Sequence, residues 1–254
     1  MRSLVTGGTS GLGAAFAREL AAQGSDLILV ARDEERLDAI AEELRATHDV
    51  VVDVLRADLS VEADLMRVAA ALEDPDRPID LLVNNAGFGM HTKLCDPDVQ
   101  SHRYALNVMC YAVLVLGGAA GRAMRSRGHG RIINVSSLAG WTTQGHYSAI
   151  KAWVRSYSDS LGNELHGTGV TVTAACPGWV RTEFHQRAGI RTSSLPDWVW
   201  AEADPVARDI LKDAWRGRAI SVPTASWKLA RALLQFGPPA AVRAVSRALV
   251  RSRD

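Results

Sequence analysis

The sequence predicts an α/β fold, a single domain built on one doubly wound parallel sheet of about seven strands with helices on both faces. Two observations favour this class. Short apolar runs alternate with segments of helical periodicity, which is the order of repeated βαβ units. The apolar runs are continuous, as in strands that helices cover on both sides. The 254 residues, 47% hydrophobic and 22% charged, fit one globular domain.

The expected elements follow the chain in a simple alternation. The strands are expected at Ser3–Thr6, Asp26–Ala31, Val50–Leu55, Ile79–Asn84, Arg131–Ser136 and Val170–Ala175, with a last one near Ala219–Val222. The helices are expected at Gly11–Gln23, Asp33–Ala46, Val61–Leu72, Val99–Arg127, His146–Leu165 and near Pro205–Arg216. Because crossovers between parallel strands are right-handed, this order predicts a doubly wound sheet.

The segment Trp179–Asp204 interrupts this order, since its aromatic and polar residues have no clear period. Ligands of such sheets bind beyond the carboxyl ends of the strands. The region of about residues 179–215 can therefore form a substrate lid, or it can be a structural excursion. The same choice applies to its aromatic residues, which would line an apolar site or form the core of the lid: Trp179, Phe184, Trp198 and Trp200.

Charge, cysteine content and apolar runs narrow the class further. The net charge of +1 gives no overall field that would favour nucleic acid. Cys95, Cys110 and Cys176 lie far apart without metal-binding spacing, as reduced thiols of a cytoplasmic protein do, and the dispersed histidines predict no metal site. The first apolar stretch is too short for a signal peptide. The apolar run Tyr104–Ala120 is shorter than the roughly 20 residues of a membrane helix and is expected to be a buried helix.

A glycine-rich segment, TGGTSGLG from Thr6 to Gly13, joins the first strand to the first helix. Gly7, Gly11 and Gly13 allow a tight turn and let the backbone approach a pyrophosphate without a Cβ between them. The helix that follows presents free N–H groups to the anion. Its position at the first βα junction favours a dinucleotide site over a simple turn.

The spacing of this turn, G-x-x-x-G-x-G, resembles that of the short-chain dehydrogenase/reductase family. The resemblance extends to five further motifs in order: Asp58-Leu59, Asn84-Asn85-Ala86-Gly87, Asn107, Ser136-Ser137 with Tyr147-x-x-x-Lys151, and Pro177-Gly178-x-x-x-Thr182. It implies a Rossmann-type domain, with the family's aspartate, here Asp58, contacting adenine. The cofactor-binding residues that it implies are Gly7, Thr9, Ser10, Gly11, Leu12, Gly13, Asp58, Leu59, Asn84, Ala86, Gly87, Tyr147, Lys151, Pro177, Gly178, Val180 and Thr182.

The choice of dinucleotide depends on the end of the second strand. NAD-binding folds usually place an acid about 20 residues beyond the glycines, where it binds the ribose 2′-hydroxyl. This chain has Arg32 there, and a guanidinium can pair with a 2′-phosphate through two donors. The sequence therefore predicts NADP(H). The alternative is that Arg32 is exposed and that the adjacent Asp33 takes the ribose for NAD(H).

Tyr147 and Lys151 are four residues apart and share one face of a helix. A tyrosine hydroxyl titrates near pH 10, and a neighbouring ammonium favours its phenolate. Tyr147 is therefore the expected general acid and base. The resemblance implies that Lys151 also grips the nicotinamide ribose, and that Asn107 orders a water in a proton relay.

A serine hydroxyl before this helix can hold the substrate oxygen. The family's serine normally lies about a dozen residues before the tyrosine, whereas Ser137 precedes Tyr147 by ten. Ser137 is the predicted catalytic serine, with Ser136 and Thr143 as alternatives. His146 can face the substrate or cap the helix at the surface.

These residues predict an NADP(H)-dependent oxidoreductase that interconverts a small-molecule carbonyl, expected to be apolar, and a secondary alcohol. A catalytically silent dinucleotide sensor is the alternative, although it would not need Tyr147, Lys151 and Asn107 together. Epimerases and dehydratases on larger relatives of this fold have a bigger carboxyl-terminal domain, and only about seventy residues follow Thr182.

The resemblance also implies a homo-oligomer that pairs the helices Val99–Arg127 and His146–Leu165. In the first helix Gly117, Gly118 and Gly121 would permit close approach, and the second carries Trp153 and Tyr157.

The tail from Ser226 to Asp254 predicts two short amphipathic helices broken at Gly237-Pro238-Pro239. From Arg216 onward the chain has eight Lys or Arg and one acid. A basic amphipathic helix can bind an anionic membrane surface. Alternatively, its apolar faces pack over the substrate site or a partner subunit.

Overall fold

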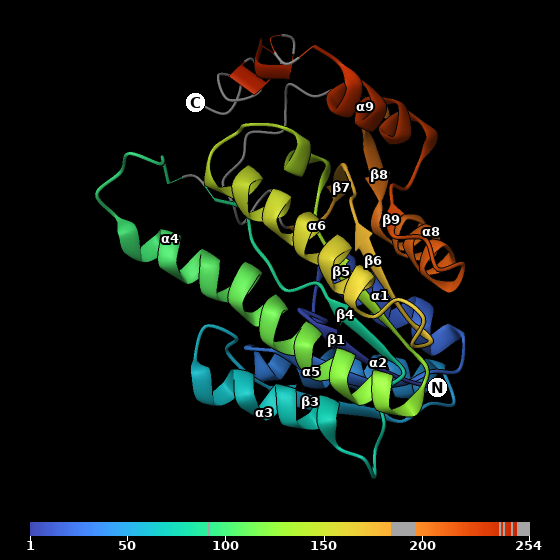
Figure 1. Cartoon of the computed structure of the whole chain (residues 1–254). Helices are drawn as coiled ribbons and strands as arrows, with labels where there is room; N and C mark the ends of the chain where they lie inside the picture. Colours follow the sequence, from blue (N-terminus) through green and yellow to red (C-terminus); the bar gives the residue numbers. More distant parts are fainter. Residues whose placement is uncertain (91, 184–196, 239, 241, 245, 248–254) are drawn as a thin grey trace.

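The computed structural model describes residues 1–90, 92–183, 197–238, 240, 242–244 and 246–247, the side chain of Trp198 excepted. Its main sheet has seven parallel strands in the order β3-β2-β1-β4-β5-β6-β9 (Figure 1). The strands are β1 Arg2–Thr6, β2 Asp26–Ala31, β3 Val52–Arg56, β4 Leu81–Asn84, β5 Gly130–Val135, β6 Val170–Ala175 and β9 Ile220–Ser221. The predicted fold class is confirmed.

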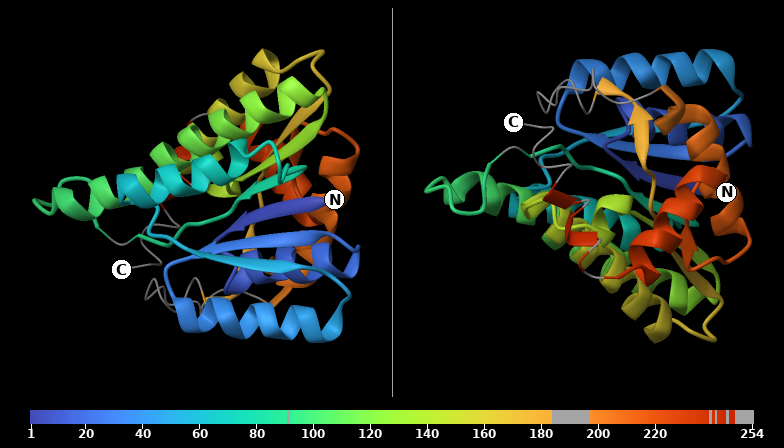
Figure 2. Two further views of the ribbon diagram at one scale, coloured as in Figure 1. Left: turned by 90° about the horizontal axis from the view of Figure 1, so that it is seen from below. Right: turned by 90° about the horizontal axis from the view of Figure 1, so that it is seen from above.

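Helices cover both faces of this sheet (Figure 2). Successive side chains of a strand point to opposite faces, so Leu4 of β1 joins the core on one side and Val5 the core on the other. The first side holds α3 (Glu62–Glu73), α5 (Ala112–Arg127) and α6 (His146–Glu164), and the second holds α1 (Gly11–Ala22), α2 (Glu34–Thr47) and α8 (Ala203–Trp215). Each strand therefore has two buried faces, which explains the continuous apolar runs.

The long helix expected at Val99–Arg127 consists of α4 (Val99–Leu106), a π-helical turn η1 (Asn107–Tyr111) and α5. By length and composition it could cross a membrane, but 61% of its most apolar window is buried inside the protein. Leu116, Ala120 and Met124 of α5 lie in the core beneath the sheet. This packing agrees with the buried helix that the sequence predicts.

Side chains of the same chain occupy the space beside two glycines of α5. A Cβ on Gly117 would lie 2.5 Å from the hydroxyl of Tyr157, and one on Gly121 would lie 3.4 Å from Leu165. The Tyr157 hydroxyl donates a hydrogen bond to the carbonyl of Leu114 at 3.2 Å. These two glycines therefore let α6 approach α5 within the chain, and the pairing of the two helices between subunits stays a prediction.

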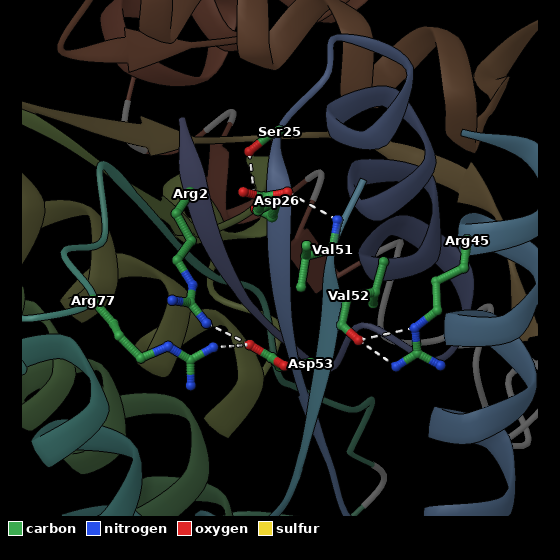
Figure 3. Close-up of polar contacts among 8 residues, drawn as sticks. All are labelled: Arg2, Ser25, Asp26, Arg45, Val51, Val52, Asp53 and Arg77. Carbon is green, nitrogen blue, oxygen red and sulfur yellow. Dashed lines mark hydrogen bonds and ion pairs between the residues drawn. The ribbon is translucent and has the colours of Figure 1, made fainter. Parts of the chain in front are cut away.

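Arginines secure the edge strand β3, whose outer backbone groups no neighbouring strand pairs (Figure 3). Arg45 of α2 donates from Nε to the carbonyl of Val52 at 3.1 Å. The Asp53 carboxylate accepts from Arg77 at 2.6 Å and also from Arg2 of the central strand β1. The Arg45 bond satisfies one backbone carbonyl of this edge strand, and the Asp53 bonds tie β3 to Arg77 and to β1.

The described residues after β6 include two short strands that the sequence pattern does not reveal. They are β7 (Trp179–Arg181) and β8 (Trp200–Glu202), which form a small parallel sheet, and the 3₁₀ turn η3 (Asp197–Val199) precedes β8. Trp179 pairs with Trp200, and their rings meet at 5.5 Å between centroids. Strands of three residues are too short for a periodicity to appear in the sequence. Phe184 and the side chain of Trp198 lie outside the described residues.

The tail begins as the sequence predicts. Helix α9 spans Ala225–Phe236, and helical structure resumes in the described residues that follow Pro238. The Thr224 hydroxyl caps α9 by accepting from the backbone N–H of Trp227 at 3.4 Å. The Ser246 hydroxyl accepts from the backbone N–H of Thr143 at 3.1 Å. The tail therefore folds back onto the loop that precedes α6.

Candidate functional site

A cavity of about 1160 Å³ lies beyond the carboxyl ends of the strands. Residues that follow β1, β2, β3, β4, β5 and β6 all contribute to its wall. Of the residues that the sequence analysis assigns to the cofactor or to catalysis, the cavity is lined by Gly7, Thr9, Ser10, Gly11, Leu12, Arg32, Asp58, Leu59, Ala86, Gly87, Ser137, Tyr147, Lys151, Pro177, Gly178, Val180 and Thr182. The structure thus brings together motifs that are spread from residue 7 to residue 182.

The turn after β1 leaves no room for a side chain at its glycine positions. Gly7 and Gly11 have φ of +67° and +53°, in the left-handed region that favours glycine. A Cβ on Gly13 would lie 2.0 Å from the carbonyl oxygen of Gly7. Gly13 does not line the cavity itself, and its role is to let α1 begin close beneath the turn.

Asn85, to which the sequence analysis assigned no role, braces this turn from β4. Its side-chain amide donates to the carbonyls of Thr6 at 3.0 Å and Gly7 at 3.3 Å. The Thr6 hydroxyl in turn accepts the backbone N–H groups of Asn85 and Ala86, each at 3.0 Å. These bonds hold the turn open toward the cavity, at the place where the backbone would meet a pyrophosphate.

Two arginines line the end of the cavity next to β2. They are Arg32 and Arg36, and Arg36 was not anticipated from the sequence. Asp33 caps α2 by accepting the backbone N–H of Arg36 at 3.1 Å, and it also pairs with the Arg36 Nε at 3.4 Å. The carboxylate that could have taken a ribose hydroxyl is thus engaged by the helix and by an arginine.

Arg32 is oriented by two partners. Its guanidinium donates to the hydroxyl of Tyr104, a residue of α4, and lies 3.9 Å from the Asp58 carboxylate. The Arg32 side chain is 64% exposed. It can therefore turn toward an anion in the cavity at little conformational cost, and its positive charge favours such a ligand.

Lys151 lies at the other end of the cavity, buried beneath Tyr147. Its ammonium donates to the carbonyl of Val135 at 2.8 Å and lies 5.6 Å from the centre of the Tyr147 ring. Burial lowers the pKa of Lys151 to about 8 from its usual 10.5, while the thiols of Cys110 and Cys176 act in the opposite direction. At neutral pH most of the lysine is still charged, so a cation stands beside the tyrosine.

The two adjacent serines have different surroundings. The Ser136 hydroxyl is buried and donates to the backbone carbonyl of Lys151 at 2.6 Å. The Ser137 hydroxyl accepts the backbone N–H of Ala139 at 3.1 Å and donates to the carbonyl of Pro177 at 3.4 Å, a long bond. Ser137 is therefore the freer of the two to meet a substrate oxygen. Thr143 is not among the described residues that line the cavity.

Three further residues that the sequence analysis considered also lie outside the described lining of the cavity. Asn84 is buried and donates to the side chain of Asn134 at 2.9 Å, so it crosslinks β4 to β5. Asn107 begins η1, where its carbonyl accepts the N–H of Ala112. The Nδ1 of His146 lies 2.6 Å from Nδ1 of His102, and burial followed by the charge of His102 lowers the pKa of His146.

An apolar wall faces the Tyr147 end of the cavity. Its residues come from the β4 loop, the β7 region and α9, and they are Phe88, Met90, Trp179, Val199, Trp227, Ala230, Leu233 and Leu234. Trp227 is buried and donates from its ring N–H to the carbonyl of Val199 at 3.3 Å. A Cβ on Gly178 would lie 2.6 Å from the same ring. The inner face of α9 therefore packs over the site, as one alternative for the tail predicts.

The fold and the cavity define the class of protein, an oxidoreductase of the doubly wound α/β type with a dinucleotide turn and a Tyr-Lys pair in one pocket. The family model for short chain dehydrogenases matches residues 2–191. The chain belongs to the short-chain dehydrogenase/reductase family.

Similar proteins agree with this assignment. An uncharacterized oxidoreductase of Staphylococcus epidermidis is 32% identical over 206 residues, which is 78% of this chain and 88% of the relative. A short-chain dehydrogenase from Sphingobium yanoikuyae, solved in complex with NADPH, is 34% identical, with a TM-score of 0.84 over 92% of this chain and 93% of its own. The bulky-bulky ketone specific alcohol dehydrogenase from Comamonas testosteroni is 30% identical, with a TM-score of 0.79 over 94% and 95%.

Proposed function

We propose that this protein is an NADP(H)-dependent reductase that interconverts a bulky apolar ketone and its secondary alcohol. The observation that carries the proposal is one cavity with three chemically different parts. Two arginines and the glycine-rich turn line it after β2 and β1, the Tyr147-Lys151-Ser137 group lines it after β5 and from α6, and apolar side chains from the β7 region and α9 complete the lining. The order of these parts is that of a dinucleotide phosphate, a reacting carbonyl and an apolar substrate.

The residues present fit a nicotinamide dinucleotide. The turn at Gly7 and Gly13 is a cradle that a Cβ would fill, and the start of α1 offers N–H groups to a pyrophosphate. Arg32 and Arg36 would hold the 2′-phosphate of NADP(H), because a guanidinium can donate two hydrogen bonds to a phosphate group. The similar Sphingobium dehydrogenase was solved with NADPH, which supports the same preference here.

The bound nicotinamide would supply or accept the hydride. Tyr147 would give its hydroxyl proton to the carbonyl oxygen during reduction and take it back during oxidation. The Lys151 ammonium stabilises the phenolate that remains after proton transfer, since an opposite charge nearby favours the ionised form. Ser137 would donate a hydrogen bond to the same oxygen and stabilise its developing negative charge. The bond from Lys151 to Val135 fixes the lysine for this task.

The substrate class follows from the wall opposite Tyr147. Four of its side chains come from α9, and Trp227, Leu233 and Leu234 are large and apolar. A polar substrate would leave its hydrogen-bonding groups unpaired against such a wall, which opposes binding. The similarity to a dehydrogenase described as specific for ketones with two bulky groups supports the same class for this protein.

The first experiment is oxidation of NADPH with a panel of bulky aryl and alicyclic ketones. Tyr147→Phe should lower kcat by about 10² to 10⁴, because it removes the general acid. Binding of NADPH to the variant, measured by fluorescence, should stay unchanged and serves as the control. A variant that keeps more than about a tenth of kcat in a chemistry-limited assay contradicts the assignment. NADPH binding without turnover of any ketone would favour the sensor instead.

The second experiment concerns the cofactor. Arg32→Ala and Arg36→Ala should each weaken NADPH binding by about tenfold or more, because a hydrogen bond to a charged group contributes about 1.5–3 kcal/mol. NADH binding should hardly change and provides the internal control. Equal losses for both cofactors, or tighter NADH binding by the unmodified protein, would overturn the preference for NADP(H).

A further inference from the structure

The outer face of α9 is an exposed apolar stripe. Leu229, Leu233 and Phe236 are spaced as i, i+4 and i+7, so they share one face of the helix. They are 64%, 64% and 80% exposed, and no other large apolar side chain in the described part of the chain is as exposed as Phe236. An exposed apolar stripe of this kind marks an interaction surface.

This stripe is continuous with the cavity. Trp227 and Leu234 on the inner side of α9 line the cavity, and Leu233 belongs to both the lining and the stripe. Leu233 is both exposed and part of the lining, so the apolar stripe reaches the cavity at this residue.

The segment that carries the stripe has charges of one sign. No Asp or Glu occurs between Ala225 and Arg247. Lys228, Arg243 and Arg247 are exposed, and the two arginines follow α9 in the chain. Arg231 is engaged elsewhere, with its guanidinium 5.6 Å from the centre of the Trp141 ring. Three exposed cations therefore belong to the segment that carries the stripe, one of them on α9 itself.

We propose that the outer face of α9 docks on an anionic phospholipid bilayer, with the mouth of the cavity open to the lipid. Apolar side chains enter the boundary between headgroups and acyl chains, while cations near the surface are attracted to anionic headgroups. A second copy of the chain is a poorer occupant. In a twofold interface the same patch faces itself, so Lys228, Arg243 and Arg247 of both copies would meet without an acid from this segment.

The test is co-sedimentation of the full chain with vesicles of phosphatidylcholine alone and of phosphatidylcholine with phosphatidylglycerol. The unmodified protein should sediment with the anionic vesicles at low salt and lose this binding at high salt. The double substitution Leu229→Asp with Phe236→Asp should lower partitioning by at least about tenfold, because it removes apolar contact and adds repulsion. Lys228→Glu and Arg243→Glu should each lower it by about fivefold or more.

The matched control is Met66→Asp, which places the same charge on a residue of α3 that is 51% exposed and far from α9 in the chain. It should leave vesicle binding unchanged. None of the substituted residues lines the cavity, so all variants should keep the NADPH affinity and unfolding midpoint of the unmodified protein. Those two measurements exclude misfolding as the cause of lost binding.

Three results would overturn the proposal. They are absence of binding to anionic vesicles at low salt, binding that the double substitution leaves intact, and a shift from oligomer to monomer in light scattering caused by that substitution. The idea that the bilayer supplies the ketone substrate depends on the proposed function as well as on docking. If the protein reduces no ketone, co-sedimentation still decides the docking. If it reduces soluble ketones but binds no vesicles, only the docking fails.

Discussion

Replacing Lys151 with methionine is expected to stabilise the protein without cofactor at neutral pH while abolishing turnover. Lys151 is buried, and its charged form is disfavoured there. Methionine keeps an unbranched apolar stem of similar length and carries no charge. The substitution therefore removes the penalty for a buried ammonium with little loss of packing.

The magnitude follows from the pKa of Lys151, which burial lowers from 10.5 to about 8. A shift of this size corresponds to about 3 kcal/mol between the folded and unfolded states. The lost hydrogen bond to Val135 offsets about 1 kcal/mol of the gain. We expect Lys151→Met to raise the free energy of unfolding by about 2 kcal/mol at pH 7.

The pH dependence has a definite sign. Between about pH 8 and pH 10.5 the unfolded chain holds the Lys151 proton and the folded chain has lost it. The unmodified protein therefore gains stability as pH rises through this window. The advantage of the methionine variant should be complete below pH 8 and should disappear toward pH 10.5.

Urea unfolding of both proteins at pH 7 and at about pH 10 measures these differences. Lys212→Met, at an exposed position of α8, is the control and should change stability little at either pH. A variant that is less stable than the unmodified protein at pH 7 would refute this reasoning. It would mean that the contacts of the Lys151 ammonium stabilise the fold by more than its burial destabilises it.

Other substitutions test the turn, the serines and the oligomer. Gly13→Ala should destabilise the fold by about 1–3 kcal/mol and abolish the thermal shift caused by NADPH, because its Cβ would lie 2.0 Å from the Gly7 carbonyl oxygen. Gly162→Ala is the control and should have neither effect, because the nearest atom to its Cβ is 3.7 Å away. Ser137→Ala should lower kcat by about 10² to 10³, whereas Ser136→Ala should keep most of kcat; the reverse order would move the role to Ser136. Leu114→Asp, on the exposed side of α5, should convert the expected dimer or tetramer to a monomer in light scattering. Unmodified protein that is already monomeric at micromolar concentration would contradict that expectation.

The parts that could be predicted from the sequence depend on local pattern. Strands β2 and β6 have the expected bounds, because the apolar run of β2 ends at the charged pair Arg32-Asp33 and β6 is followed closely by Pro177-Gly178. The glycine turn and the Tyr147-Lys151 pair were found for the same reason, since each is a short motif at a strand end or on one helix face. Their meeting in one cavity follows from the parallel sheet, in which all carboxyl ends lie at one edge.

The parts that were missed depend on contacts between distant segments. Arg36 gives no local signal, and its place in the cavity becomes evident only when α2 is packed beside the turn. Tyr104 lies 72 positions from Arg32, which it orients. The pairing of β7 with β8 joins Trp179 to Trp200, which are far apart in the sequence compared with the length of either strand. Contacts between residues far apart in the sequence leave no periodic pattern in a short stretch of it, so they could not be predicted.

The short loop before Tyr147 has a structural counterpart in the tail. Trp141 in this loop is flanked by two arginines, Arg155 of α6 at 4.8 Å and Arg231 of α9 at 5.6 Å from the ring centre. The backbone N–H of Thr143 is taken by Ser246. The loop before Tyr147 and the tail are thus in direct contact through Trp141 with Arg231 and through Thr143 with Ser246. Because α9 also lines the cavity, we expect a change in the loop or in the tail to alter the apolar part of the cavity wall.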